Sequence, residues 1–463
     1  MGFVLSILYF VTYYLTPVTL FGPLAPYRIE LILAVLIVFA SLPGLRKSFI
    51  LKTTQSLALI GLAVAAFMSV LVGVRWAGGA VQALLGFIPN AFGFFLVCLH
   101  CNSKRKLQVV VLMLLFVCLF VIAQGGADLL RGSQESIQSL PTDAYHAYAQ
   151  AWQMEHPYLL PKPNDGGPNR LKGLGMINDP NDFGQVTVCV IPLVFIFWRA
   201  RKMLWNFAFV LAPVGLLVLG VYLTHSRGAL VALIAVVVVA ARRRIGTLPA
   251  LLVAGGLFAA AMAFQFTGGR AISAEAGADR TALWGEGLQM LKSHPVFGVG
   301  YGNFMQHAEN TAHNSVVVCV AELGIVGLFF WCMFLFPTLR DALVASSSAK
   351  VSEAVPMIAE ESLFPQPMKT REEIDKAEIN RLGRLMVLSL TGFLVAGWFL
   401  SRAYVMTFFL LGGMVEVVYE MALQRGMIAP RVKLFRALLY SGGLEVSLLA
   451  AMYIMLRIVN LMH

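Results

Sequence analysis

Apolar stretches of about 18 residues or more recur along the whole 463-residue chain. Segments of this length and composition cross lipid bilayers, where only a helix or a closed barrel satisfies its own backbone hydrogen bonds. A barrel would require short strands of alternating polarity, and the sequence has none. Only 13% of the residues are charged, against about 25% in soluble domains. The sequence therefore predicts an all-α, polytopic integral membrane protein that forms a single transmembrane domain over 1–463.

The positions of the apolar runs predict about twelve spans. These are 3–22, 28–45, 55–74, 80–100, 106–125, 183–199, 204–224, 227–241, 248–266, 313–336, 385–400 and 404–423. The segment 437–463 is also long enough to span, but Glu445 and Arg457 lie within it. We favour an interfacial helix there and keep a thirteenth span as the alternative.

Lys and Arg gather in the loops that follow even-numbered spans. The clusters are Arg46, Lys47 and Lys52; Lys104, Arg105 and Lys106; Arg199, Arg201 and Lys202; and Arg242, Arg243 and Arg244. Basic loops stay in the cytoplasm, so the amino terminus and the polar segment 337–384 are predicted to be cytoplasmic. The second half of this segment, 370–384, has alternating charge and is predicted to form a solvated helix. The long loops 126–182 and 267–312 then face outward, to the periplasm of a bacterial inner membrane. The net charge of +11 reflects these loops and indicates no nucleic-acid partner.

Two polar residues stand at the outer ends of predicted spans. Arg227 follows Ser226 at the head of one run, and His313 precedes Asn314 at the head of another. Ser226 and Asn314 suit helix caps, while an arginine at a helix start suits an anion such as phosphate. An imidazole titrates near neutral pH and can take a proton from a hydroxyl. His225, His294 and His307 are rival bases in less telling positions.

Other polar motifs have simpler interpretations. Asp179-Pro180-Asn181-Asp182 has the pattern of a helix start, and metal binding by its two acids lacks a third ligand. Glu322, inside a predicted span, requires a polar network or a structural partner. The glycines from Gly298 to Gly302 indicate a tight turn. Cys98 and Cys101 lack the second ligand pair of a zinc site.

An ordered set of motifs resembles a known family. The set comprises NDPNDFGQ from Asn178, SRGAL from Ser226, Arg280 with Trp284, HPVFGVGYGNF from His294, and HNSVVVCVAELGIVG from His313. Their order and spacing resemble the O-antigen ligase and O-antigen polymerase superfamily of membrane glycosyltransferases. Before 178 the chain is similar to the family in character only.

The resemblance implies an enzyme that takes a glycan from undecaprenyl diphosphate and passes it to an acceptor hydroxyl, on a glycan, lipid A-core or another molecule. It implies two arginines on the diphosphate, Arg227 and Arg280, and His313 as the base. We also expect substrate contacts from Ser226, Asn314, Arg170, Lys172 and Tyr301. Arg270, in the same loop, rivals Arg280. The resemblance implies no metal and no cofactor.

Several alternatives stay open. Ligase and polymerase carry similar carboxy-terminal motifs, so the resemblance does not separate them. A transporter is disfavoured because the polar residues gather at one membrane face and no internal repeat is visible. A metal-dependent glycosyltransferase is disfavoured because the first outer loop, 21–26, holds no acid. A flippase of lipid-linked glycans would differ by making no covalent transfer.

Overall fold

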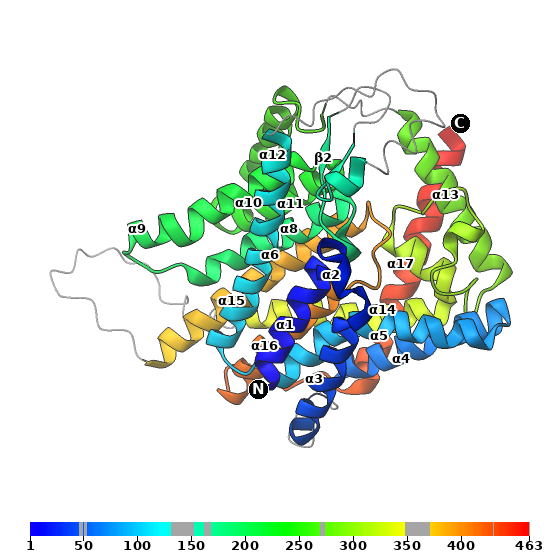
Figure 1. Ribbon diagram of the computed structural model, residues 1–463, viewed down its shortest axis with the longest axis horizontal. Helices are drawn as coiled ribbons and strands as arrows, with labels where there is room; N and C mark the ends of the chain where they lie inside the picture. The colour runs from blue at the N-terminus through cyan, green and yellow to red at the C-terminus, as the bar shows by residue number, and fades with distance from the viewer. Residues whose placement is uncertain are drawn as a thin grey trace.

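The computed structural model describes residues 1–45, 50, 53–130, 152–161, 168–268, 274–347, 371–428 and 430–462. Helices dominate this part of the chain (Figure 1). The longer ones are α1 (Gly2–Leu15), α3 (Ile29–Leu45), α4 (Thr54–Met68), α5 (Ala77–His100), α6 (Lys104–Leu130), α8 (Pro180–Val194), α10 (Ala212–Leu223), α11 (Arg227–Ile245), α12 (Thr247–Ala263), α13 (Ala274–Ser293), α14 (Ser315–Ser347), α15 (Arg371–Gly397), α16 (Met406–Gln424) and α17 (Leu434–Met462). The all-α prediction is confirmed for these residues.

The short elements complete the connections. The short α-helices are α2 (Pro17–Leu20) and α9 (Met203–Asn206). The 3-10 helices are η1 (Gly22–Tyr27), η4 (Gly175–Ile177), η5 (Phe195–Phe197) and η7 (Phe304–Gln306), and the π-helices are η3 (Ser69–Val74) and η6 (Phe207–Leu211). Two short strands are also present. The strands β1 (Leu159–Leu160) and β2 (Arg170–Leu171) pair antiparallel, with Leu159 opposite Leu171. This small ladder is the only sheet in the described ranges.

Nine helices in the described residues are long and apolar enough to cross a membrane. They cover 54–74, 77–100, 104–129, 180–197, 203–223, 315–347, 372–397, 406–424 and 434–458, and shorter apolar helices cover 2–15, 29–44 and 247–263. These helices are those of a multi-pass membrane protein. The helix α16 is central, with 89% of its apolar window buried, whereas α17 has 11% of its window buried and lies in the right-hand half of the view, inward of α13 (Figure 1).

Two predicted boundaries need correction. The first span was predicted over 3–22, but α1 ends at Leu15 because Thr16 turns left-handed (φ 41°) and Pro17 follows. The polar segment predicted from 337 begins later, because α14 continues to Ser347, whereas the helix expected in its second half is present as the start of α15 at Arg371. The carboxy-terminal helix α17 has the length and composition of a span, and the choice between an interfacial helix and a thirteenth span stays a prediction.

The helix α14 is broken near its middle. Gly324 has φ 64° and ψ −165°, and the turn from Pro295 to Gly300 inserts its backbone there. Val299 N–H donates to Ala321 O at 2.9 Å, and Ile325 N–H donates to Pro295 O at 3.0 Å. The break therefore keeps backbone hydrogen bonds despite its burial, as a membrane environment requires.

The side chain of Glu322 belongs to the same junction. It is 5% exposed, and its Oε1 accepts the N–H of Phe304 at 3.4 Å. Gly298, Gly300 and Gly302 all have positive φ, as expected for a tight glycine turn. Glu322 thus has the structural partner that a carboxylate inside a span requires.

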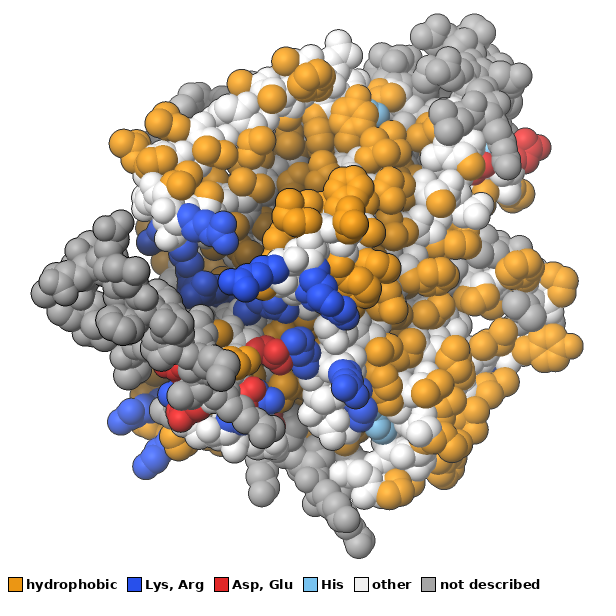
Figure 2. Space-filling view, turned by 90° about the vertical axis from the view of Figure 1, so that its left-hand side faces the viewer, with side chains coloured by type: hydrophobic (Ala, Val, Ile, Leu, Met, Phe, Trp, Pro, Cys, Tyr) orange, Lys and Arg blue, Asp and Glu red, His pale blue; other side chains and the backbone are white. Residues whose placement is uncertain are grey.

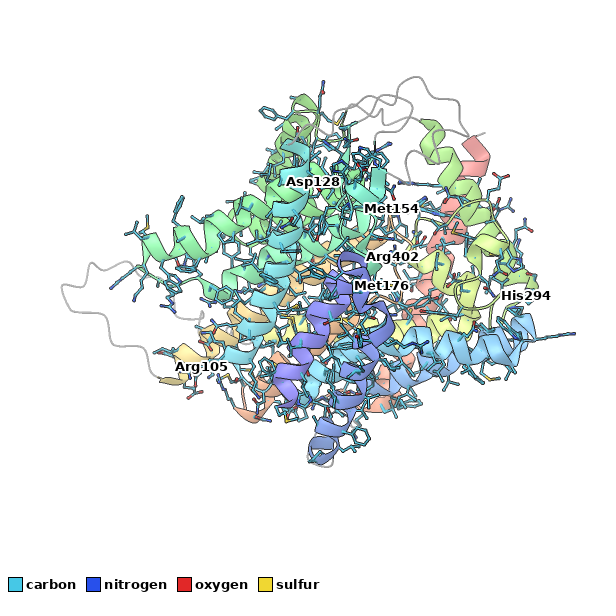
Figure 3. The ribbon with its side chains drawn as sticks, in the orientation of Figure 1. Arg105, Asp128, Met154, Met176, His294 and Arg402 are labelled. Carbon is cyan, nitrogen blue, oxygen red and sulfur yellow. The ribbon has the colours of Figure 1, made fainter. Side chains whose placement is uncertain are left out.

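Basic side chains gather on one face of the molecule. Figure 2 shows Lys and Arg concentrated on the face at the left of Figure 1, the side on which Figure 3 labels Arg105. Arg199 and Arg201 after α8 are exposed, as are Arg242, Arg243 and Arg244 at the end of α11. The amino-terminal ends of α8 and α11 accordingly point to the opposite side, where the candidate site lies.

Candidate active site

Three helices begin at the candidate site, and each begins with a polar cap. Asp179 caps α8, Ser226 caps α11 and Asn314 caps α14. Each side chain accepts backbone N–H groups from its own first turn, at 2.7 Å for Asp179, 3.3 Å for Ser226, and 2.9 and 3.1 Å for Asn314. The helix-start interpretation of 179–182 is therefore confirmed. Helix starts carry partial positive charge and favour anions nearby.

Side chains tie the start of α8 to that of α11. The Asn181 Oδ1 accepts from Ser226 Oγ at 2.7 Å and from Arg170 Nη2 at 3.1 Å. Arg170 Nε donates to the Thr224 carbonyl at 2.9 Å, and the residue is 7% exposed. Gly184 permits the close approach, because a Cβ there would lie 2.8 Å from the Cβ of Ala229. Arg170 and Ser226 thus hold the starts of α8 and α11 together.

A second set of contacts ties α8 to α14. Asp182 accepts two hydrogen bonds from the guanidinium of Arg402, one from Nε at 2.6 Å and one from Nη2. The backbone N–H of Arg402 donates to Ser315 Oγ at 3.1 Å, and Ser315 Oγ donates to Leu400 O at 2.7 Å. The connection between α15 and α16 is thereby fastened to both helix starts.

Arg280 and the first turn of α11, which begins at Arg227, both lie against Phe399. The Arg280 guanidinium carbon is 5.9 Å from the centre of the Phe399 ring. Phe399 packs on the first turn of α11, where a Cβ on Gly228 would lie 3.1 Å from the Phe399 Cβ. Partial burial lowers the pKa of Arg280, and the charge of Arg227 lowers it further. Two half-buried cations that repel each other suit a shared anion.

His313 adopts a left-handed conformation, with φ 48°. Such a backbone is uncommon for a residue other than glycine and recurs at functional sites. The preceding carbonyl, of Ala312, accepts from Trp284 Nε1 at 2.8 Å. Partial burial lowers the pKa of His313, Arg280 lowers it further, and Asp179 opposes them. The imidazole is consequently neutral at neutral pH and able to accept a proton.

The rival histidines have other surroundings. His225 is buried, and its Nδ1 pairs with the Phe266 carbonyl at 2.9 Å. His294 and His307 are exposed, and His294 lies at the right-hand edge of the molecule, well apart from Arg402 (Figure 3). Of these four histidines, His313 is the half-buried one whose pKa Arg280 lowers, whereas His225 lies two residues from Arg227 and pairs with a backbone carbonyl.

Two other predicted residues, Lys172 and Tyr301, lie in different parts of the fold. Lys172 is half-buried near Asp179, with its pKa lowered by burial and raised again by that carboxylate. Tyr301 lies in the glycine turn, where its N–H donates to Ser69 Oγ at 3.0 Å and its ring packs on Tyr404. Burial raises the pKa of Tyr301. Arg270 lies outside the described residues.

Asn314 serves the fold rather than presenting an open side chain. It is fully buried, and its Nδ2 donates to the Trp398 carbonyl at 3.2 Å while its Oδ1 caps α14. This arrangement favours the capping role that we weighed for Asn314. Among the described residues, no group of three or more His, Cys, Asp or Glu could hold a metal ion.

The sequence interpretation missed Arg402 and the proximity of Asp179 to His313. A signal for Arg402 was present, because Ser401-Arg402 repeats the Ser226-Arg227 dipeptide in a short outer loop. Its partner Asp182 is 220 residues away in sequence. Only the folded chain reveals such a pair.

The fold and the site together define a multi-pass membrane protein with a basic, histidine-containing site at the starts of three helices. Residues 212–332 match the family model described as O-antigen ligase. The matched region includes Arg227, Arg280 and His313, and it confirms the resemblance to the O-antigen ligase and polymerase superfamily. The match supports a membrane enzyme of the glycosyltransferase type. A comparison with curated proteins found no match.

Proposed function

We propose that this protein transfers a glycan from undecaprenyl diphosphate to an acceptor hydroxyl at the periplasmic face of a bacterial inner membrane, as an O-antigen ligase does. The donor's diphosphate binds between Arg227 and Arg280. The acceptor hydroxyl lies against His313. The observation that carries the proposal is that Arg280, within α13, acts electrostatically on both Arg227 and His313, which lie at the capped starts of α11 and α14.

The chemistry follows from these roles. The acceptor oxygen attacks the anomeric carbon and forms the new glycosidic bond. The bond from that carbon to the phosphate oxygen breaks, and the lipid diphosphate leaves with the electron pair. Arg227 and Arg280 stabilise the growing negative charge. His313 takes the hydroxyl proton. Attack from the face opposite the leaving group inverts the anomeric configuration.

The charges in the site support this division of labour. A diphosphate between Arg227 and Arg280 would relieve their repulsion, which lowers the pKa of Arg280. Asp179, which raises the pKa of His313, would stabilise the imidazolium that forms during transfer. Lys172 beside Asp179 could contact phosphate or acceptor. Tyr301 could contact the glycan from the glycine turn.

Reconstitution tests the proposal. Purified protein in liposomes would receive a lipid-diphosphate glycan and candidate acceptors, with and without a chelator. We expect covalent transfer that survives chelation. Transfer restored only by magnesium or manganese would contradict metal independence. Movement of the lipid-linked glycan across the bilayer without a new glycosidic bond would indicate a flippase.

The acceptor separates the second candidate function from the first. A polymerase of the same superfamily would extend the glycan on another lipid-linked glycan, whereas a ligase would use lipid A-core or a different hydroxyl. The orientation is tested by cysteine labelling, which should reach position 313 from outside and position 242 from the cytoplasm. Labelling of position 313 only from the cytoplasm would contradict the proposed mechanism.

A further inference from the structure

One charged pair next to the site has no role in the proposed chemistry. Arg402, between α15 and α16, holds Asp182 in the first turn of α8 by two hydrogen bonds. We propose that this ion pair is a positioning device that fixes the start of α14, with its base, relative to the start of α11, with its arginine. The inference rests on the proposed function.

A continuous set of contacts connects the two helix starts through this pair. Ser315, two residues after His313, accepts from the backbone of Arg402; Arg402 donates to Asp182; and Asn181, the neighbour of Asp182, accepts from Ser226, the neighbour of Arg227. Asn181 therefore holds the start of α11, and Asp182 holds the start of α14 through Arg402. Removing Arg402 breaks this connection between His313 and Arg227.

The geometry of the pair suits positioning better than general stabilisation. A two-pronged arginine–carboxylate contact fixes orientation as well as distance. The Asp182 side chain is 5% exposed and that of Arg402 is 32% exposed. Because burying such a pair costs about as much as its attraction returns, it is weak evidence for stability alone.

Loss of the Arg402–Asp182 ion pair should lower the rate of transfer. A displacement of about 1 Å between reacting groups can reduce the rate roughly 10²-fold. Arg402→Ala should therefore reduce turnover about 100-fold while donor affinity changes much less, because Arg227 and Arg280 are still present. Arg402→Lys keeps the charge but loses the planar fork, so it should restore only part of the rate.

The chain offers a matched control at another place in the fold. Arg431 pairs with Glu416, whose side chain is fully buried, and with Glu420, and its own side chain is 24% exposed. Arg431→Ala therefore breaks a partly buried ion-pair cluster near the end of α16, whereas Arg402 lies before the start of that helix. It should lower thermal stability and leave turnover per folded molecule unchanged.

The experiment combines two measurements on monodisperse protein. Single-turnover transfer and donor binding are measured for wild type, Arg402→Ala, Arg402→Lys, Arg431→Ala and His313→Ala. Separately, spin labels at Met176→Cys and Asn310→Cys, both exposed positions near the starts of α8 and α14, report the distance distribution between these two helix starts, which the ion pair connects. Arg402→Ala should broaden it, and Arg431→Ala should not.

The outcomes separate the inference from the proposed function. Wild-type turnover in folded Arg402→Ala, or equal losses in Arg402→Ala and Arg431→Ala, would overturn the positioning role. An unchanged distance distribution in Arg402→Ala would overturn it regardless of activity. If wild type transfers no more glycan than His313→Ala, the proposed function fails, and the distance measurement still decides whether the pair holds the helix starts together.

Discussion

Replacing Asn314 by alanine should destabilise the protein before it affects chemistry. The change removes the acceptor for two backbone N–H groups of α14 and the donor to the Trp398 carbonyl. Losing a helix cap costs about 1–2 kcal/mol, and leaving a buried carbonyl without a donor costs about 1–3 kcal/mol. The free energy of unfolding should fall by about 2–5 kcal/mol in total.

Thermal unfolding of detergent-purified protein, followed by intrinsic fluorescence, measures this effect. Asn314→Ser keeps a good cap but loses the contact with Trp398, so it should melt between wild type and Asn314→Ala. Asn310→Ala is the control, because Asn310 is exposed and bonds only its neighbour Thr311. It should change stability by less than about 0.5 kcal/mol. Wild-type melting of Asn314→Ala together with lost turnover would refute the capping account.

Two further predictions concern the charges around the base and the break in α14. Activity should decline as the pH falls through the pKa of His313, because the protonated imidazole cannot act as a base. Arg280 lowers that pKa and Asp179 raises it. Arg280→Gln should therefore move the acid limb of the pH–rate profile to higher pH, and Asp179→Asn should move it to lower pH. Unshifted limbs would contradict the placement of these charges. Gly324→Ala should lower the melting temperature far more than Gly256→Ala, because its Cβ would meet a carbonyl oxygen of the inserted turn at 2.4 Å, whereas Gly256 has nothing within 4 Å. Similar melting of the two variants would contradict the insertion.

The sequence predicted those helix starts that are set by residues adjacent in the chain. Asp179 and Ser226 are good caps before apolar runs, and both cap helices in the structure. The break in α14 was invisible, since Gly324 lies in an apolar run whose composition predicts a continuous helix. The positive φ there is sustained by a turn from another part of the chain.

The site could be predicted only where a single residue carries its own signal. Arg227 and His313 were identifiable from their positions at the heads of apolar runs. Arg402 stands in a similar Ser-Arg dipeptide, but its contacts could not be predicted, because Asp182 and Ser315 are brought to it by the fold from distant positions. The end of α14 was misplaced because the residues after 336 continue the helix instead of ending it.

The division of labour between His313 and Arg227 is the central claim, and one comparison tests it most directly. Donor binding and single-turnover transfer would be measured on folded His313→Ala and Arg227→Ala, with His294→Ala as an exposed control. His313→Ala should lose turnover by about 10²–10⁴-fold and still bind the lipid-linked donor. Arg227→Ala should lose turnover by roughly 10²–10³-fold and bind the donor more weakly. Near-normal turnover in folded His313→Ala would contradict the account.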